Sequence, residues 1–201
     1  MRFLAERAGV PVPEQDLGEK QTMARRARMI SAYKDAARYY HSVLMSPEGE
    51  KGLAYLSGRR LSPATLRHFG LGYAPDKWDG LLTHMLARGY TREELLDARL
   101  VTKGKSGNLY DVFRGRVMFP IIDTRGNVIA FGGRVMDDSQ PKYLNSNDTL
   151  LFKKSYQLFA LNFAKNKNDG RLILAEGYMD VISLHLSLIH ISTLPMPPPG
   201  I

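Results

Sequence analysis

Apolar residues recur at three- and four-residue steps between Lys20 and Leu44, and this period predicts one long helix. Shorter helical segments follow at residues 46–58 and 62–69, and each of them opens with a Ser-Pro pair. The string Thr91-Arg-Glu-Glu94 matches a capping box and predicts a further helix start. The part from about residue 20 to residue 99 is therefore predicted to be helical.

From about residue 100 the pattern changes to short runs rich in Val, Ile and aromatic residues, which are typical of strands. We expect strands at residues 109–113, 116–122, 128–131 and 172–175, helices at 157–164 and from Asp180 to Leu186, a hairpin turn at 124–127 and a polar loop at 166–170. The predicted fold class is α+β, with a helical, basic lobe followed by a mixed α/β lobe at residues 100–170.

The two ends of the chain differ from its centre. Residues 1–19 are interpreted as a short helix and a connector, because Pro11 and Pro13 favour extended backbone. Residues 187–201 are expected to be non-native or disordered. Four prolines fall within residues 195–200, and LSLIHIS, which begins at Leu186, is also the translation of a transposon end used as a sequencing adapter.

Composition narrows the class of protein. The chain has 201 residues, a formal charge of +8 and no cysteine, which excludes disulfides and cysteine-ligated zinc sites. Basic residues outnumber acids six to one over residues 20–38 and twelve to six over residues 103–171. This excess favours a nucleic-acid partner. No secretory leader or membrane-length apolar run is present in the sequence, so a cytoplasmic protein is the expectation.

Candidate chemistry lies in the string RLILAEGYMDVISLH at residues 171–185. An apolar run ends in Glu176, Gly177 follows, and Asp180 stands at the start of the next helix-like segment. Two carboxylates so placed can hold a divalent metal near phosphate, although the bare spacing is also common in proteins without such a site. The five histidines show no metal-ligand spacing, and the sequence contains no phosphate-binding glycine loop.

The amino-acid identities in four short strings are more informative than the spacing of the two carboxylates. Four strings resemble bacterial replicative primases of the DnaG type and follow one another in the same order as in that family. They are FRGRVMFPI at Phe113, FGGRV at Phe131, PKYLNS at Pro141 and EGYMDV at Glu176. The resemblance implies a central RNA-polymerase domain that ends soon after residues 171–186, the start of a TOPRIM domain. It implies RNA primer synthesis on a single-stranded DNA template from ribonucleoside triphosphates, with Mg²⁺ or Mn²⁺, in a bacterium or phage.

Site residues follow from the same resemblance. Glu176 and Asp180 are expected to be catalytic, and Glu176 is expected to bind the metal. Later carboxylates of the family are missing, so this chain alone is expected to be inactive. The family's zinc-binding domain and the domain that contacts the replicative helicase are also absent from the sequence. Residues expected to contact template or nucleotide are Arg114, Arg116, Arg134, Lys142, Tyr143, Asn145, Ser146 and Lys154.

Within that set, Arg134, Lys142 and Glu176 are expected to line one basic cleft, and only one of Arg114 and Arg116 is expected to face it. Trp78 is interpreted as core or surface filler. Two other readings stay open at this point. One is a single-strand-binding module without chemistry, and the other is a different TOPRIM enzyme, a topoisomerase or nuclease, which does not account for the PKYLNS and FRGRVMFPI strings.

Overall fold

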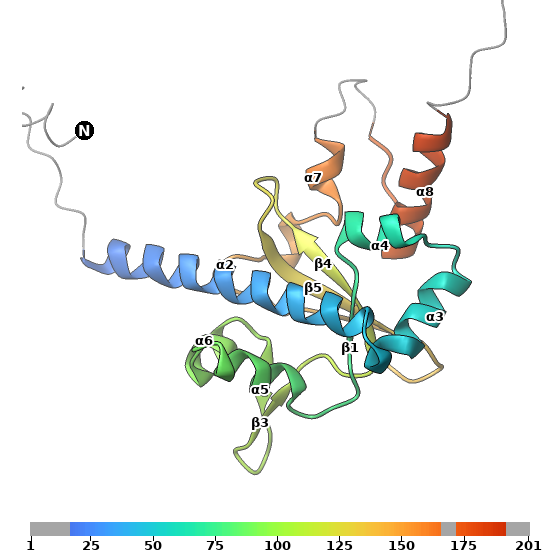
Figure 1. Cartoon of the computed structure of the whole chain (residues 1–201). Coiled ribbons are helices and arrows are strands. Elements are labelled where there is room, and N and C mark those ends of the chain that lie inside the picture. Colours follow the sequence, from blue (N-terminus) through green and yellow to red (C-terminus); the bar gives the residue numbers. More distant parts are fainter. Residues whose placement is uncertain (1–16, 166–171, 192–201) are drawn as a thin grey trace, which may run out of the picture.

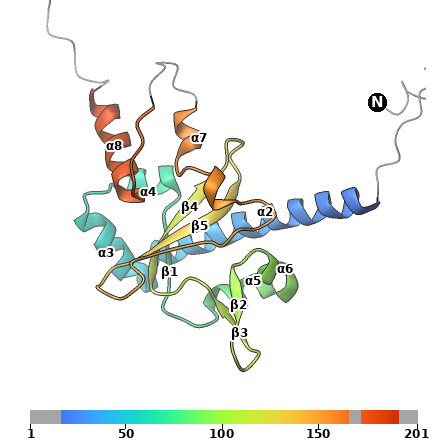
Figure 2. The ribbon, with the colours of Figure 1, turned by 180° about the vertical axis from the view of Figure 1, so that it is seen from behind.

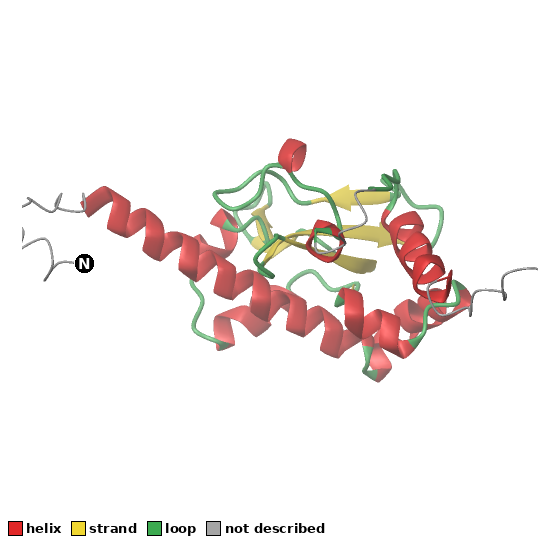
Figure 3. Ribbon diagram, turned by 90° about the horizontal axis from the view of Figure 1, so that it is seen from above, coloured by secondary structure: helices red, strands yellow, loops and turns green. Residues whose placement is uncertain are grey.

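A computed structural model of the chain describes residues 17–165 and 172–191. Its longest element is α2 (Leu17–Leu44), which confirms the predicted long helix. Tyr33, Ala36 and Tyr40 are buried on one face of α2, and the tyrosine rings contact Phe131 of the sheet at 6.0 and 5.4 Å between centroids. Figures 1 and 3 show α2 lying along one face of the sheet.

Three short helical segments follow α2: η1 (Pro47–Gly49), α3 (Glu50–Gly58) and α4 (Pro63–Phe69). The Ser62 hydroxyl accepts a hydrogen bond from the Thr65 amide, which starts α4 as the Ser-Pro pair predicts. Gly70 ends α4 with a positive φ of 64°, a conformation that glycine adopts without steric cost. The predicted helical segments 46–58 and 62–69 are therefore confirmed.

The sheet is antiparallel, with strand order β1–β4–β5–β6. Its members are β1 (Gly72–Ala74), β4 (Arg116–Ile122), β5 (Val128–Val135) and β6 (Tyr143–Asn145). β5 runs four residues beyond the predicted end at residue 131, because Gly132 and Gly133 continue the pairing with β4. Side chains alternate between faces along each strand, so Met118 and Phe131 face α2 while Val117 and Phe119 face the other way.

A second layer beneath α2 contains α5 (Gly80–Ala87), α6 (Arg92–Asp97) and the hairpin of β2 (Val101–Lys103) and β3 (Leu109–Asp111). The predicted capping box is present, with hydrogen bonds between Thr91 and Glu94 in both directions. Glu94 also accepts from Arg28 at 2.6 Å and so connects α6 to α2. Figure 2 shows this hairpin and the sheet from behind.

Three expectations for the later part of the chain need correction. The helix predicted at 157–164 is only α7 (Leu161–Ala164), preceded by η2 (Lys154–Tyr156). Ala160 has a φ of 62°, which interrupts a right-handed helix immediately before Leu161. The strand predicted at 109–113 stops at Asp111.

The third correction concerns residues 172–175, which form no strand. Leu172, Ile173 and Leu174 are 57%, 58% and 70% exposed, and none of the described strands pairs with them. A strand is stable only when a neighbour accepts and donates its ladder hydrogen bonds, so an apolar run without that neighbour remains irregular. The helix that follows is present as α8 (Tyr178–Ile191), and Asp180 lies in its first turn.

The expected boundaries also shift at several places. α2 already includes residues 17–19 of the expected connector, and β1 lies within the part expected to be helical. α8 continues to Ile191, five residues into the expected tail. Residues 1–16, the loop at 166–170 and the tail from 192 onward lie outside the described residues. No helix among the described residues is long and apolar enough to cross a membrane.

Candidate nucleic-acid interface

Arg134 occupies the centre of the candidate surface, near the end of β5. Its side chain is 9% exposed, and its guanidinium lies between two rings, 4.9 Å from the Tyr55 centroid and 5.6 Å from that of Tyr143. Arg59 lies 5.5 Å from the Tyr55 ring. We call Tyr55, Arg59, Arg134 and Tyr143 the tyrosine–arginine cluster. It brings α3 and the strands β5 and β6 together at one place.

The charge of Arg134 has no carboxylate partner among the described residues. Its Nη1 donates only to the Val135 carbonyl at 3.3 Å, and its buried Nε has no hydrogen-bond partner within that part of the chain. A buried cation without a counter-charge is costly, and an anion would offset that cost. The cluster is therefore electrostatically suited to a phosphate, and its rings are suited to bases.

The residues of the PKYLNS string have different surroundings, because some are exposed and others contact the sheet or α8. Lys142 is exposed, and its carbonyl accepts from Val135 and extends the β5–β6 pairing. Ser146 is buried, and its hydroxyl accepts from the Phe131 amide at 3.0 Å, so its observed contact is to the sheet. Asn145 is half-buried and accepts a hydrogen bond from the Tyr178 hydroxyl at 2.6 Å.

Tyr178 packs the start of α8 against the sheet. Its ring stacks on Phe119 with centroids 5.0 Å apart and lies directly over Gly132. Burial raises the pKa of Tyr178 to about 12, so its hydroxyl stays a donor to Asn145. Because Tyr178 is two residues beyond Glu176, this contact also places Glu176 beside the sheet.

A hollow of about 860 Å³ opens between α7, α8 and the sheet. Its lining includes Tyr143, Asn145, Lys154, Glu176 and Tyr178. Arg134 and Lys142 are not part of that lining, so the expectation of one cleft holding Arg134, Lys142 and Glu176 is not met as stated. Tyr143 connects the two regions, because it lines the hollow and also contacts Arg134.

Glu176, which is expected to bind a metal, and Asp180, the second residue expected to be catalytic, are both exposed. The described residues contain no group of three or more His, Cys, Asp or Glu side chains that could hold a metal ion. Two carboxylates supply only part of the oxygen shell of a divalent cation. The residues present thus fit part of a metal site and do not form one by themselves.

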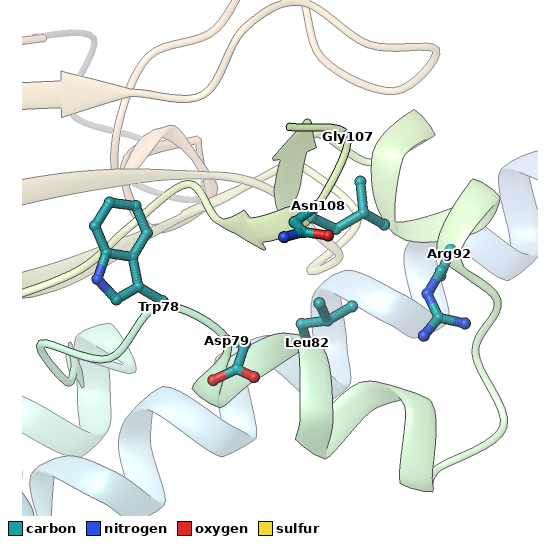
Figure 4. Close-up of a pocket in the computed structure, with 7 residues that line it drawn as sticks. Trp78, Asp79, Leu82, Arg92, Gly107 and Asn108 are labelled. Carbon is teal, nitrogen blue, oxygen red and sulfur yellow. The ribbon is translucent and has the colours of Figure 1, made fainter. Parts of the chain in front are cut away.

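A second aromatic surface lies at the loop before α5. Trp78 is 67% exposed, and Arg114 lies 4.4 Å from its ring centroid and 5.0 Å from that of Tyr110. We call Trp78, Tyr110 and Arg114 the Trp78 platform. Beside it is a hollow of about 500 Å³, in which Asn108 and Leu82 face each other and Arg92 and Trp78 stand at opposite ends (Figure 4).

Arg114 and Arg116 have different surroundings, as the alternation about Gly115 predicts. Arg116 is buried on the α2 side of the sheet, and its Nη1 donates to the carbonyls of Gly133 and Pro141 at 3.4 and 2.9 Å. Burial lowers the pKa of Arg116, and the nearby positive charge of Arg114 acts in the same direction. Arg116 therefore supports the loop before Lys142, while half-buried Arg114 belongs to the Trp78 platform.

Sequence reasoning missed Tyr55, Arg59, Trp78 and Tyr110. The strings YLSGRR at Tyr55 and KWDG at Lys77 carry no periodic or motif signal that separates them from helix surface or loop. Their contacts are long-range: Tyr55 meets Arg134, and Trp78 meets Arg114. The one available hint was a tryptophan flanked by lysine and aspartate, residues that favour the surface.

Comparison with known proteins places this geometry in a family. The model of the DNA primase catalytic core, N-terminal domain, matches residues 39–165. The chain belongs to the DNA primase catalytic core family. It is 46% identical to the DNA primase of Deinococcus radiodurans over 188 residues, and 43% identical to that of Clostridium acetobutylicum over 187. Each comparison covers 92% of this chain and 31% of the relative, so the chain spans about a third of their length.

Solved structures of the family share the fold. A DnaG primase catalytic domain bound to single-stranded DNA superposes with a TM-score of 0.76 at 38% identity, covering 81% of this chain and 51% of that one. The RNA polymerase domain of the Mycobacterium tuberculosis primase gives 0.77 at 36%, covering 82% of this chain and 54% of that one. These likenesses confirm the predicted family and the α+β fold class.

Proposed function

We propose that this chain is the template-holding part of a DNA primase and that it binds single-stranded DNA without reading its sequence. The observation that carries the proposal is Arg134, a buried guanidinium with no acidic partner among the described residues, held between Tyr55 and Tyr143. Phosphate would supply the missing counter-charge, and the rings offer faces for bases. The binding of a related catalytic domain to single-stranded DNA supports the same reading.

Two exposed cations belong to this surface. Lys142 immediately precedes Tyr143, the first residue of β6, and Arg59, a member of the cluster, lies 5.5 Å from the Tyr55 ring. The Trp78 platform adds Arg114 and an open indole at the α5 end. Cations that track a backbone, interleaved with aromatic faces, are the usual means of holding a single strand of any sequence. Direct base readout would instead require side chains aimed at base edges.

In the whole protein, we propose that Glu176 and Asp180 contribute to a Mg²⁺ or Mn²⁺ site together with carboxylates from the continuation that relatives carry. The metal would neutralise the triphosphate and the attacking oxygen during joining of ribonucleotides. This chain's own part is to hold Glu176 beside the sheet through the contact of Tyr178 with Asn145. A single-strand-binding module without chemistry remains the second candidate, favoured by the exposure of Glu176 and Asp180 and the absence of a described metal cluster.

The binding proposal is tested by titrating a fluorescein-labelled single strand and following its anisotropy. Arg134→Met keeps an unbranched stem between the rings and removes the cation, so affinity should fall about tenfold or more. Arg125→Met is the matched control, because Arg125 is exposed at the turn before β5, the opposite end of that strand from Arg134. Equal loss of affinity in both variants, or in neither, would contradict the assignment of Arg134.

The catalytic proposal needs the chain followed by the remainder that its relatives carry. In that protein, Glu176→Gln removes a charge and keeps the size of the side chain. Primer synthesis should fall at least about a hundredfold, since each ~1.4 kcal/mol of barrier is about tenfold in rate. Template binding should change little, and near-normal synthesis would remove Glu176 from the catalytic role.

A further inference from the structure

Asp111, at the end of β3, is the buried residue that joins the parts of the Trp78 platform. Its side chain is 3% exposed, and its two carboxylate oxygens accept from the first amides of α5, Oδ2 from Leu81 at 2.7 Å and Oδ1 from Leu82 at 2.9 Å. These contacts fix the backbone of Asp111 against the helix that follows Trp78. The sequence alone indicates no role for Asp111 beyond a position in a strand.

The main chain of Asp111 holds the platform itself. Its N–H donates to the Trp78 carbonyl at 2.7 Å, and its own carbonyl accepts from Nη1 of Arg114. Arg114 in turn lies over the indole at 4.4 Å and near Tyr110, the residue before Asp111. One residue thus connects the α5 amides, the loop that carries Trp78, and the guanidinium that covers the indole.

We propose that Asp111 is a positioning residue for nucleic-acid binding, which holds Trp78 and Arg114 so that a base of the single strand stacks on the exposed indole. This inference rests on the proposed function, because it assumes that a single strand occupies the surface. Asp111 itself is buried and touches no strand. It acts by keeping the platform assembled before the strand arrives, which reduces the ordering cost of binding.

The geometry requires a carboxylate. Leu81 and Leu82 each direct an N–H at a different oxygen, and an asparagine offers one acceptor and turns its NH₂ toward the other donor. Protonation has a similar effect, since one oxygen then carries a hydrogen. The charged or titratable groups facing Asp111 are Asp79 on the α5 side, Arg114 on its own loop, and Tyr39 and Tyr40 on α2.

Burial raises the pKa of Asp111 to about 6, with the two amides opposing the shift and Asp79 adding to it. The ionised form that holds both amides therefore predominates above pH 6 and is lost as pH falls through that value. The ordering of the Trp78 side chain should change with pH in parallel with the ionisation of Asp111. The platform should be ordered at pH 7.5 and looser at pH 5.

The experiment uses the fluorescence of Trp78, the single tryptophan of the chain. In the free protein at pH 7.5, Asp111→Asn should increase acrylamide quenching and lower the fluorescence anisotropy of Trp78. On titration with oligothymidylate, the wild type should show Trp78 quenching by base stacking, and Asp111→Asn should bind at least about fivefold more weakly with less quenching at saturation. The wild type at pH 5 should resemble Asp111→Asn, whose own signal should not change between pH 7.5 and 5.

Two controls separate the possible failures. Tyr33→Phe removes a different buried hydrogen bond, to the Ala98 carbonyl, and should leave the Trp78 signals unchanged, which excludes general destabilisation as the cause. Lys142→Ala should weaken binding without altering Trp78 in the free protein.

If the wild type binds no strand, the proposed function fails. If it binds with Trp78 quenching but Asp111→Asn behaves as wild type, or if Trp78 in the wild type is insensitive to pH between 7.5 and 5, the positioning role of Asp111 is wrong. The pH arm keeps the test decisive if Asp111→Asn does not fold.

Discussion

Gly132→Ala gives a direct test of how Glu176 is placed against the sheet. A Cβ at Gly132 would lie 2.5 Å from Cζ and 2.6 Å from the hydroxyl oxygen of Tyr178, well inside van der Waals contact. The Tyr178 ring must then leave its place on Phe119 and give up the hydrogen bond to Asn145. Overpacking costs ~1–3 kcal/mol and the hydrogen bond ~1 kcal/mol, against a gain of ~0.5–1 kcal/mol from the stiffer unfolded chain. The net loss in free energy of unfolding should be ~1–3 kcal/mol.

The assay is urea unfolding followed by circular dichroism. Gly58→Ala is the matched control, because its added Cβ meets nothing within 4 Å and should be neutral or slightly stabilising. In a Tyr178→Leu background the cost of Gly132→Ala should shrink by at least about half, since the clashing ring is gone. An unchanged cost in that background, or no cost in the wild type, would refute the placement of Tyr178 over Gly132.

Three further predictions concern stability. Thr91→Ala removes the α6 cap and should lower the free energy of unfolding by ~1 kcal/mol, measured by urea denaturation beside the control Thr124→Ala, an exposed position in the turn before β5. Tyr33→Phe should cost ~1 kcal/mol, because its hydroxyl donates to the Ala98 carbonyl at 2.7 Å, whereas Tyr40→Phe should be neutral or stabilising, because that buried hydroxyl has no partner among the described residues. Thermal melts that rank the two in the opposite order would contradict this. Because the pKa of Asp111 is raised from 3.8 to about 6, the folded chain retains a proton that the unfolded chain releases, so the contribution of Asp111 to stability should fall by up to ~3 kcal/mol as pH rises from about 4 to 6. Asp111→Asn should remove that slope.

The ionised form of Asp111 therefore has two opposed effects. It costs folding free energy through burial, and it orders the Trp78 platform through the two amides of α5. Buried charges that lower stability are often kept where they serve a function. The two measurements, unfolding against pH and Trp78 anisotropy against pH, should accordingly move in opposite directions between pH 4 and 7.

Local sequence patterns correctly predicted the elements that form through interactions between residues close together in the sequence. The apolar period of α2, the Ser62 cap, the Thr91 capping box and strand β4 were all predicted from neighbours within a few residues. The run at 172–175 was predicted wrongly as a strand, because its apolar character signals burial but a strand requires a partner elsewhere in the chain. Motif strings singled out Arg134 and Tyr143 as candidates, but could not predict which residues would contact them. Tyr55 is 79 residues from Arg134 in sequence, so no local pattern could have paired them.

The salt dependence of single-strand binding tests the central claim most directly. Four cations carry the proposed surface, namely Arg59, Arg114, Arg134 and Lys142. Releasing counterions from about four phosphates predicts that log affinity falls with log salt at a slope of roughly −2 to −3, and Lys142→Ala should reduce its magnitude by ~0.7 while weakening all sequences alike. An affinity that does not depend on salt, or a slope that Lys142→Ala leaves unchanged, would contradict the claim that this surface holds a single strand by its phosphates.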